Sequence, residues 1–105
     1  MDKVINILNK TGFTYAYDHF TEGISHDFPF ICYRVNNSRH FAADNKPYFK
    51  KNLINLELYT EKKEPETEKK IEALLEENNI FYSKSETFIE SEKMLEILYQ
   101  FEMEE

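Results

Sequence analysis

Two stretches of the chain carry apolar residues at the spacing of an amphipathic helix. The first runs from Asp2 to Lys10, and its apolar positions are Val4, Ile5, Ile7 and Leu8. The second runs from about Pro65 to Asn78, with an apolar stripe at Ile71, Leu74 and Leu75. Pro65 suits a first helical turn because its missing N–H has no partner there. Asn78 and Asn79 can end this helix in the left-handed conformation. The pattern therefore predicts two helices.

Five other stretches are typical of β-strands. FTYAYDHF (13–20) and NLINLELYTEK (52–62) alternate with a period of two. FPFICYRV (28–35) is apolar on both sides, as expected for a strand covered on both faces. Residues 80–89 and 93–103 read as a hairpin joined by Glu90-Ser91-Glu92. Its second strand places five apolar residues on one face: Leu95, Ile97, Tyr99, Phe101 and Met103.

The order of these elements predicts an α+β fold. We expect a mainly antiparallel β-sheet with two helices, near the N-terminus and at about 65–78, packed on one face, and a C-terminal β-hairpin. The chain has 105 residues, the size of one domain. Because neither a linker nor a repeat divides it, residues 1–105 are expected to form a single domain.

Composition and charge narrow the range of functions. Hydrophobic residues make up 41% of the chain and aromatic residues 15%, too much for a disordered protein. The net charge of −7 repels phosphates, so we expect no specific nucleic-acid partner. The start, MDKVINILNK, lacks the apolar core of a secretory signal, and the apolar runs are too short to span a bilayer. We expect a protein of a reducing cytoplasm with no membrane partner.

The residue types of metal and catalytic sites form no recognisable constellation in the sequence. His19, His26, His40 and the single Cys32 lack the close pairing by which one element presents two zinc ligands. Cys32 lies in an apolar run, where a free thiol behaves as a small core residue. The chain has 2 glycines, too few for a phosphate-binding loop. We therefore expect no metal, no cofactor and no enzymatic activity.

The segment HFAADNKPYFKKN (40–52) combines turn chemistry with aromatic residues. Asp44-Asn45 and Lys46-Pro47 favour a turn. Phe41, Tyr48 and Phe49 are unusually apolar for a loop that faces water, and lysines at 46, 50 and 51 surround them. Either these aromatic side chains pack back onto their own domain, or a partner covers them.

Three motifs carry a resemblance to a known family: FAADNK (41–46), ELYTEKK (57–63) and FIESEK (88–93). Together with the residues around them, over roughly 28–101, they resemble small proteins encoded by phages and prophages of Gram-positive bacteria. Those proteins belong to the gene block for head–tail joining and tail assembly. They look like tail-terminator, or tail-completion, proteins of long-tailed phages. Such proteins are small α+β subunits that form a ring, usually a hexamer, on the tail tube where the capsid docks.

The resemblance implies a structural virion protein that associates with itself in a ring. It implies a subunit that stays monomeric in solution until it meets the tail tip. It also implies docking to the tail tube protein and to the head–tail connector proteins. The expected location is the host bacterial cytoplasm during assembly and the head–tail junction of the virion afterwards. The neck of such phages also contains head-closure and adaptor proteins of similar size. The resemblance is therefore also compatible with one of those roles.

A closed ring requires two different contact surfaces on each subunit, and aromatic residues dominate interface cores. We therefore expect the central segment to supply one of these surfaces. The candidate interface residues are Phe41, Asp44, Lys46, Tyr48, Phe49, Lys50 and Lys51. Their lysines would meet acidic residues of the next subunit, such as Glu61, Glu64 and Glu68.

An acidic chain is also compatible with a different class of protein. A phage inhibitor that mimics DNA, and so blocks a host nucleic-acid-binding protein, would carry a strong negative charge. Such a mimic needs acidic residues in rows at phosphate-like spacing. In YTEKKEPETEKK (59–70) the acidic residues instead alternate with lysines, as on an ordinary solvated helix entry. The sequence therefore favours the structural virion protein.

Overall fold

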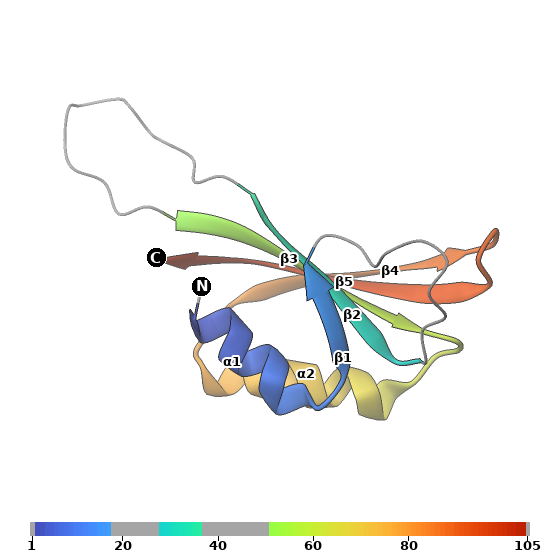
Figure 1. Ribbon diagram of the computed structural model, residues 1–105, viewed down its shortest axis with the longest axis horizontal. Helices are drawn as coiled ribbons and strands as arrows, with labels where there is room; N and C mark the ends of the chain where they lie inside the picture. Colours follow the sequence, from blue (N-terminus) through green and yellow to red (C-terminus); the bar gives the residue numbers. More distant parts are fainter. Residues whose placement is uncertain (1, 18–27, 37–50, 105) are drawn as a thin grey trace.

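The computed structural model describes residues 2–17, 28–36 and 51–104, which form two helices and a five-stranded sheet (Figure 1). The helices α1 (Asp2–Thr11) and α2 (Pro65–Glu77) lie next to each other on one face of the sheet. The strands are β1 (Thr14–Tyr17), β2 (Phe30–Asn36), β3 (Lys51–Thr60), β4 (Tyr82–Ile89) and β5 (Met94–Glu104). The predicted α+β class and the C-terminal hairpin are confirmed.

The strand order in the sheet is β1-β2-β3-β5-β4. β1 pairs with β2 in parallel, and the other three pairs are antiparallel. β5, the last strand in the chain, therefore lies between β3 and β4 rather than at an edge. Its pairing with β3 runs from Thr60 opposite Leu95 to Lys51 opposite Glu104. β1 and β4 are the two outer strands of the described sheet.

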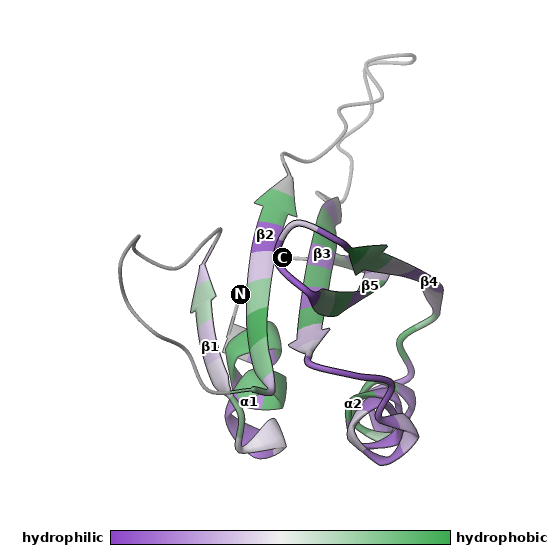
Figure 2. Cartoon of the chain, turned by 90° about the vertical axis from the view of Figure 1, so that its right-hand side faces the viewer, coloured by the Kyte–Doolittle hydropathy of each residue, from purple (hydrophilic) through white to green (hydrophobic). Residues whose placement is uncertain are grey.

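The core lies between the helices and the sheet face that they cover. Figure 2 shows both helices on the same side of β2 and β3, whose hydrophobic residues stand out along the strands. The five residues predicted to share one face of the last strand do so: four are buried, and Met103 packs against the core. They meet apolar residues from both helices: Val4, Ile7, Leu8, Ile71 and Leu75. This prediction is confirmed. The alternation in β5 is regular because one face of the strand is buried in the core.

Several element ends follow from single residues. β2 begins at Phe30, two residues later than expected, because Pro29 has no N–H to donate to a sheet. α2 ends at Glu77, and Asn79 adopts φ 57°, the left-handed conformation predicted for this end. β1 covers only part of the predicted strand 13–20, whose last residues lie outside the described ranges.

Cys32 is buried, as predicted, with 6% of its surface exposed. Its neighbours Ile31 and Tyr33 belong to the core beneath the helices. Because successive side chains of a strand alternate, Cys32 points to the opposite face of the sheet. The thiol is therefore shielded in the sheet, as expected for a structural cysteine rather than a reactive one.

Candidate functional site

The interface residues predicted from the sequence lie outside the described ranges, with one partial exception. Phe41, Asp44, Lys46, Tyr48, Phe49 and Lys50 fall within 37–50, as does His40. Lys51 is the first residue of β3, and only its backbone is described. His19 and His26 also lie outside. The hypothesis that this segment forms an interface thus stays a prediction.

Among the residues that the structure describes, no group of three or more His, Cys, Asp or Glu side chains is arranged to hold a metal ion. Neither of the two described helices is long and apolar enough to cross a membrane.

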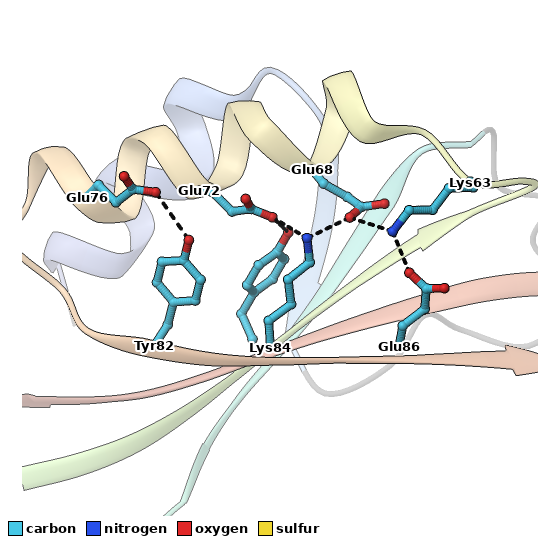
Figure 3. A network of polar contacts seen from close by, with 8 residues as sticks. Lys63, Glu68, Glu72, Glu76, Tyr82, Lys84 and Glu86 are labelled. Carbon is cyan, nitrogen blue, oxygen red and sulfur yellow. Dashed lines mark hydrogen bonds and ion pairs between the residues drawn. The ribbon is translucent and has the colours of Figure 1, made fainter.

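Glu68 lies inside the fold, and not on the surface where a neighbouring subunit would meet it. Its side chain is 3% exposed and is held between α2 and β4 (Figure 3). Its Oε1 atom accepts hydrogen bonds from Lys63 Nζ at 2.9 Å and pairs with Lys84 Nζ at 2.8 Å. The expectation that Glu68 contacts the lysines of another subunit is therefore wrong, because its own lysines occupy it. Glu61 remains exposed.

The contacts of Glu68 extend into a polar network along the outer strand β4. Lys84 Nζ also donates to Glu72 Oε2 at 2.7 Å, and the Tyr99 hydroxyl donates to the same oxygen at 2.7 Å. Lys63 pairs in addition with Glu86 of β4. We call this set the α2–β4 network; its members are Lys63, Glu68, Glu72, Lys84, Glu86 and Tyr99. Most side chains of β4 are exposed. The charged contacts of the network, rather than apolar burial, therefore hold this outer strand against α2.

The charges of the network stabilise one another. Burial opposes the ionisation of Glu68, but Lys84 and Lys63 outweigh it and hold the pKa of Glu68 below its ordinary value. Burial alone would lower the pKa of Lys84, yet Glu68 and Glu72 raise it. The network therefore contributes to stability at neutral pH. That contribution is lost as pH falls through the depressed pKa of Glu68 or rises through the raised pKa of Lys84.

A second polar cluster lies on the sheet face that the helices leave uncovered. The Tyr59 hydroxyl lies 2.9 Å from Glu57 Oε2 and 3.3 Å from Glu96 Oε2. A hydroxyl has a single proton to donate, so it satisfies only one of these carboxylates at a time. Burial and the charge of Glu57 raise the pKa of Glu96. Arg34 lies 3.8 Å from Glu57 Oε1 on the same face.

We expect Glu96→Gln to raise the free energy of unfolding at neutral pH by about 1 kcal/mol, since the amide carries no charge and donates to the cluster. A carboxyl whose pKa is raised on folding stabilises the fold at low pH and loses this effect as pH rises through the folded pKa. The advantage of the variant should therefore shrink as pH falls through the raised pKa of folded Glu96 and disappear below the ordinary pKa of glutamate. Urea unfolding at several pH values measures it. Glu102→Gln, an exposed change on the same strand, serves as control. An equal gain at every pH would contradict the interpretation that the charged form of Glu96 is destabilised in the folded protein.

A groove of about 870 Å³ lies at the end of the sheet where β5 extends past β4. β4 pairs with β5 only as far as Tyr82 opposite Phe101, whereas the pairing of β3 with β5 continues to Lys51 opposite Glu104. The groove is lined by residues from α1, β3, β5 and the turn after α2, including Lys3, Leu53, Ile80, Phe81, Phe101 and Met103. Sequence reasoning missed it, because it depends on the register of three strands.

Comparison with known proteins adds no family to this picture. No protein-family model matches the chain, and a search of curated proteins also finds no match.

Proposed function

We propose that this protein is a structural component of the phage head–tail interface, a ring-forming tail terminator that caps the tail tube and docks to the head–tail connector. Support comes from the resemblance carried by residues 41–46, 57–63 and 88–93. The observation that carries most weight is the fold itself, because two helices on one face of a mainly antiparallel sheet agree with the small α+β subunit that this resemblance implies. Its partners are further copies of itself, the tail tube protein and the connector. Its place is the host cytoplasm during assembly and then the virion.

The shape of the subunit suits association side by side. A ring subunit needs two different surfaces, and the outer strands β1 and β4 lie at opposite sides of the described sheet. The side chains of β4 are exposed over most of its length. Outer strands carry backbone groups that pair readily with another chain. Lys63 and Lys84 pair with Glu68 of their own subunit, so their charges stabilise the fold and do not form a row of unpaired charges on the surface.

The test of this function is the double variant Tyr48→Ala with Phe49→Ala. We expect a folded subunit with unchanged circular dichroism that fails to cap tails. A large aromatic anchor at an interface contributes about 2 kcal/mol or more, and a ring repeats that loss at every interface. Electron microscopy of phage lysates should show filled heads separated from tails.

The wild-type chain, supplied from a plasmid, is the control and should restore joined particles. Normal virions from the double variant would show that the segment is not an interface. Unfolding of the isolated variant would show that both aromatic side chains belong to the core of their own subunit.

A further inference from the structure

The outer strand β4 is a regular edge that the rest of the described chain leaves open. It pairs with β5 on one side, without a bulge, from Tyr82 to Ile89, and it contains neither proline nor glycine. Its side chains are exposed from Ser83 to Phe88. Such an edge presents backbone N–H and C=O groups to which another extended strand can add.

The charges on β4 are held by their own subunit. Lys84 pairs with Glu68 and Glu72, and Glu86 pairs with Lys63 (Figure 3). A free charge on an edge strand opposes pairing with another chain, and a charge that is already paired opposes it less. The ammonium group of Lys84 has three N–H donors, of which its two glutamates use two. Both β4 side chains remain accessible, with 35% of Lys84 and 46% of Glu86 exposed.

The sequence along this edge is complementary to itself when it is reversed. The segment FYSKSETFI (81–89) has Ser85 at its centre, and residues at equal distances on either side of Ser85 are of matching kinds. The four pairs are Lys84 with Glu86, Ser83 with Thr87, Tyr82 with Phe88, and Phe81 with Ile89. Opposite charges, two hydroxyls, two aromatic rings, and a ring with a β-branched side chain all stabilise strands when they lie opposite each other.

We propose that β4 pairs with β4 of a second copy of this chain, antiparallel and about a twofold axis at Ser85. Lys84 of each copy then lies opposite Glu86 of the other, and the two sheets join into one continuous sheet. Residues directly opposite each other point to the same face of a sheet, so the helices of both copies cover the same face.

Hydrogen bonding and charge together determine the register. The backbone groups of every second residue point toward the open edge, and in an antiparallel pair such residues lie opposite one another. The axis can therefore pass through a residue but not between two residues. An axis at Lys84 would place two lysines opposite each other, and an axis at Glu86 two glutamates, which destabilises the pair. The axis at Ser85 avoids both arrangements.

The pairing also gives a role to two exposed aromatic side chains. Phe81 is 95% exposed and Phe88 is 48% exposed, and they stand at opposite ends of the segment. In the dimer Phe81 lies opposite Ile89 of the other copy, and Phe88 lies opposite Tyr82 of the other copy. Both rings thereby lose contact with water, which favours association.

This contact goes beyond the proposed ring. A twofold contact uses the same surface on both copies and closes at two, whereas a larger ring needs two different surfaces. The resemblance implies a monomer in solution, and the dimer differs from that expectation. Its test uses purified protein and the test of the ring uses virions, so either proposal can fail without the other.

Oxidation of the Ser85→Cys variant by oxidised glutathione tests the position of the axis. Two Cβ atoms that lie opposite each other are about 4.5–5.5 Å apart, close enough for a disulfide after a small adjustment. We expect a disulfide-linked dimer as the main product on a non-reducing gel. The wild-type chain, in which Cys32 is buried, gives the background.

Ser83→Cys is the matched control, because it lies on the same strand and face and is also exposed. Its counterpart in the other copy is displaced by four residues, about 13 Å along the strand. It should therefore cross-link at least about tenfold more slowly. Adding Thr87→Cys to the same chain should restore cross-linking, because residues 83 and 87 of the two copies lie opposite each other.

Sedimentation equilibrium of the unmodified protein measures the dimer itself. We expect a Kd of about 1 mM or tighter. Ser85→Lys places two lysines at the axis and should weaken the dimer about fivefold or more. Ser91→Lys, an exposed change in the turn of the same hairpin, alters the net charge equally and should leave the dimer unchanged. Circular dichroism checks that both variants are folded.

Three results would overturn this pairing. The first is the absence of dimers at concentrations up to about 1 mM. The second is equal cross-linking of Ser85→Cys and Ser83→Cys, which would indicate random collision. The third is a dimer that Ser85→Lys leaves unchanged, which would show that the copies associate through another surface.

Discussion

Replacing Lys63 and Lys84 together by methionine should lower the free energy of unfolding at neutral pH, because the buried carboxylate of Glu68 would lose both of its cationic partners. Both lysines hold the Oε1 atom of Glu68, whose side chain is 3% exposed. The methionines fill similar space but carry no charge, so Glu68 would have to stay buried and unpaired or become protonated. Urea unfolding followed by circular dichroism measures the loss.

The control is a second pair of lysines, Lys62→Met with Lys69→Met. Both are exposed and belong to the same region, so this pair changes the net charge equally. We expect a change of less than about 0.5 kcal/mol from this control, as for ordinary surface substitutions. The deficit of the Lys63 and Lys84 variant should shrink as pH falls, because a protonated Glu68 needs no cation. Equal losses in the two pairs would show that net charge, and not the buried contact, sets the stability.

Tyr99→Ala should destabilise the fold by about 3–5 kcal/mol, as do other truncations of large aromatic residues in a core. Tyr99 is fully buried, with 0% of its surface exposed, and its ring meets that of Tyr82 edge to face at 5.5 Å. Tyr99→Phe keeps the ring and removes only the hydrogen bond to Glu72. It should cost about 1 kcal/mol, since Glu72 keeps its contact with Lys84.

The comparison of the two Tyr99 variants separates packing from hydrogen bonding. Chemical unfolding of both proteins under the same conditions gives the two losses directly. If the phenylalanine variant lost as much stability as the alanine variant, the hydroxyl and not the ring would anchor β5 beneath α2.

Much of the fold was predictable because local patterns determine it. The period of two in β5 follows from burial of one strand face, and Pro65 and Asn79 mark the two ends of α2 through their backbone preferences. Strand order was not predictable in the same way. The alternation shows which face of β5 is buried, but not that β5 pairs with β3 as well as with β4.

The polar interior shows a different limit of sequence reasoning. Glu68 stands three residues before Ile71 and seven before Leu75, on the buried side of α2. The sequence shows this spacing but does not show that Glu68 is buried. Glutamate is rarely buried without a charged partner, and its partner Lys84 lies far from it in the sequence. The groove escaped prediction for a related reason. It arises because β4 begins opposite Phe101, whereas β5 continues to Glu104, and this register cannot be read from the composition.

The central position of β5 has a consequence for synthesis of the subunit. Its contacts join residues far apart in the chain, from Thr60 with Leu95 to Lys51 with Glu104, and such distant contacts slow folding. While the chain emerges from the ribosome, β3 exposes one edge and the apolar residues Ile54, Leu56 and Leu58 until β5 has been made. β4 likewise waits for β5 before it can join the sheet. Chaperones would therefore meet a nascent chain with an incomplete sheet, and the outer strand that faces possible neighbours would form only when translation of β5 is complete.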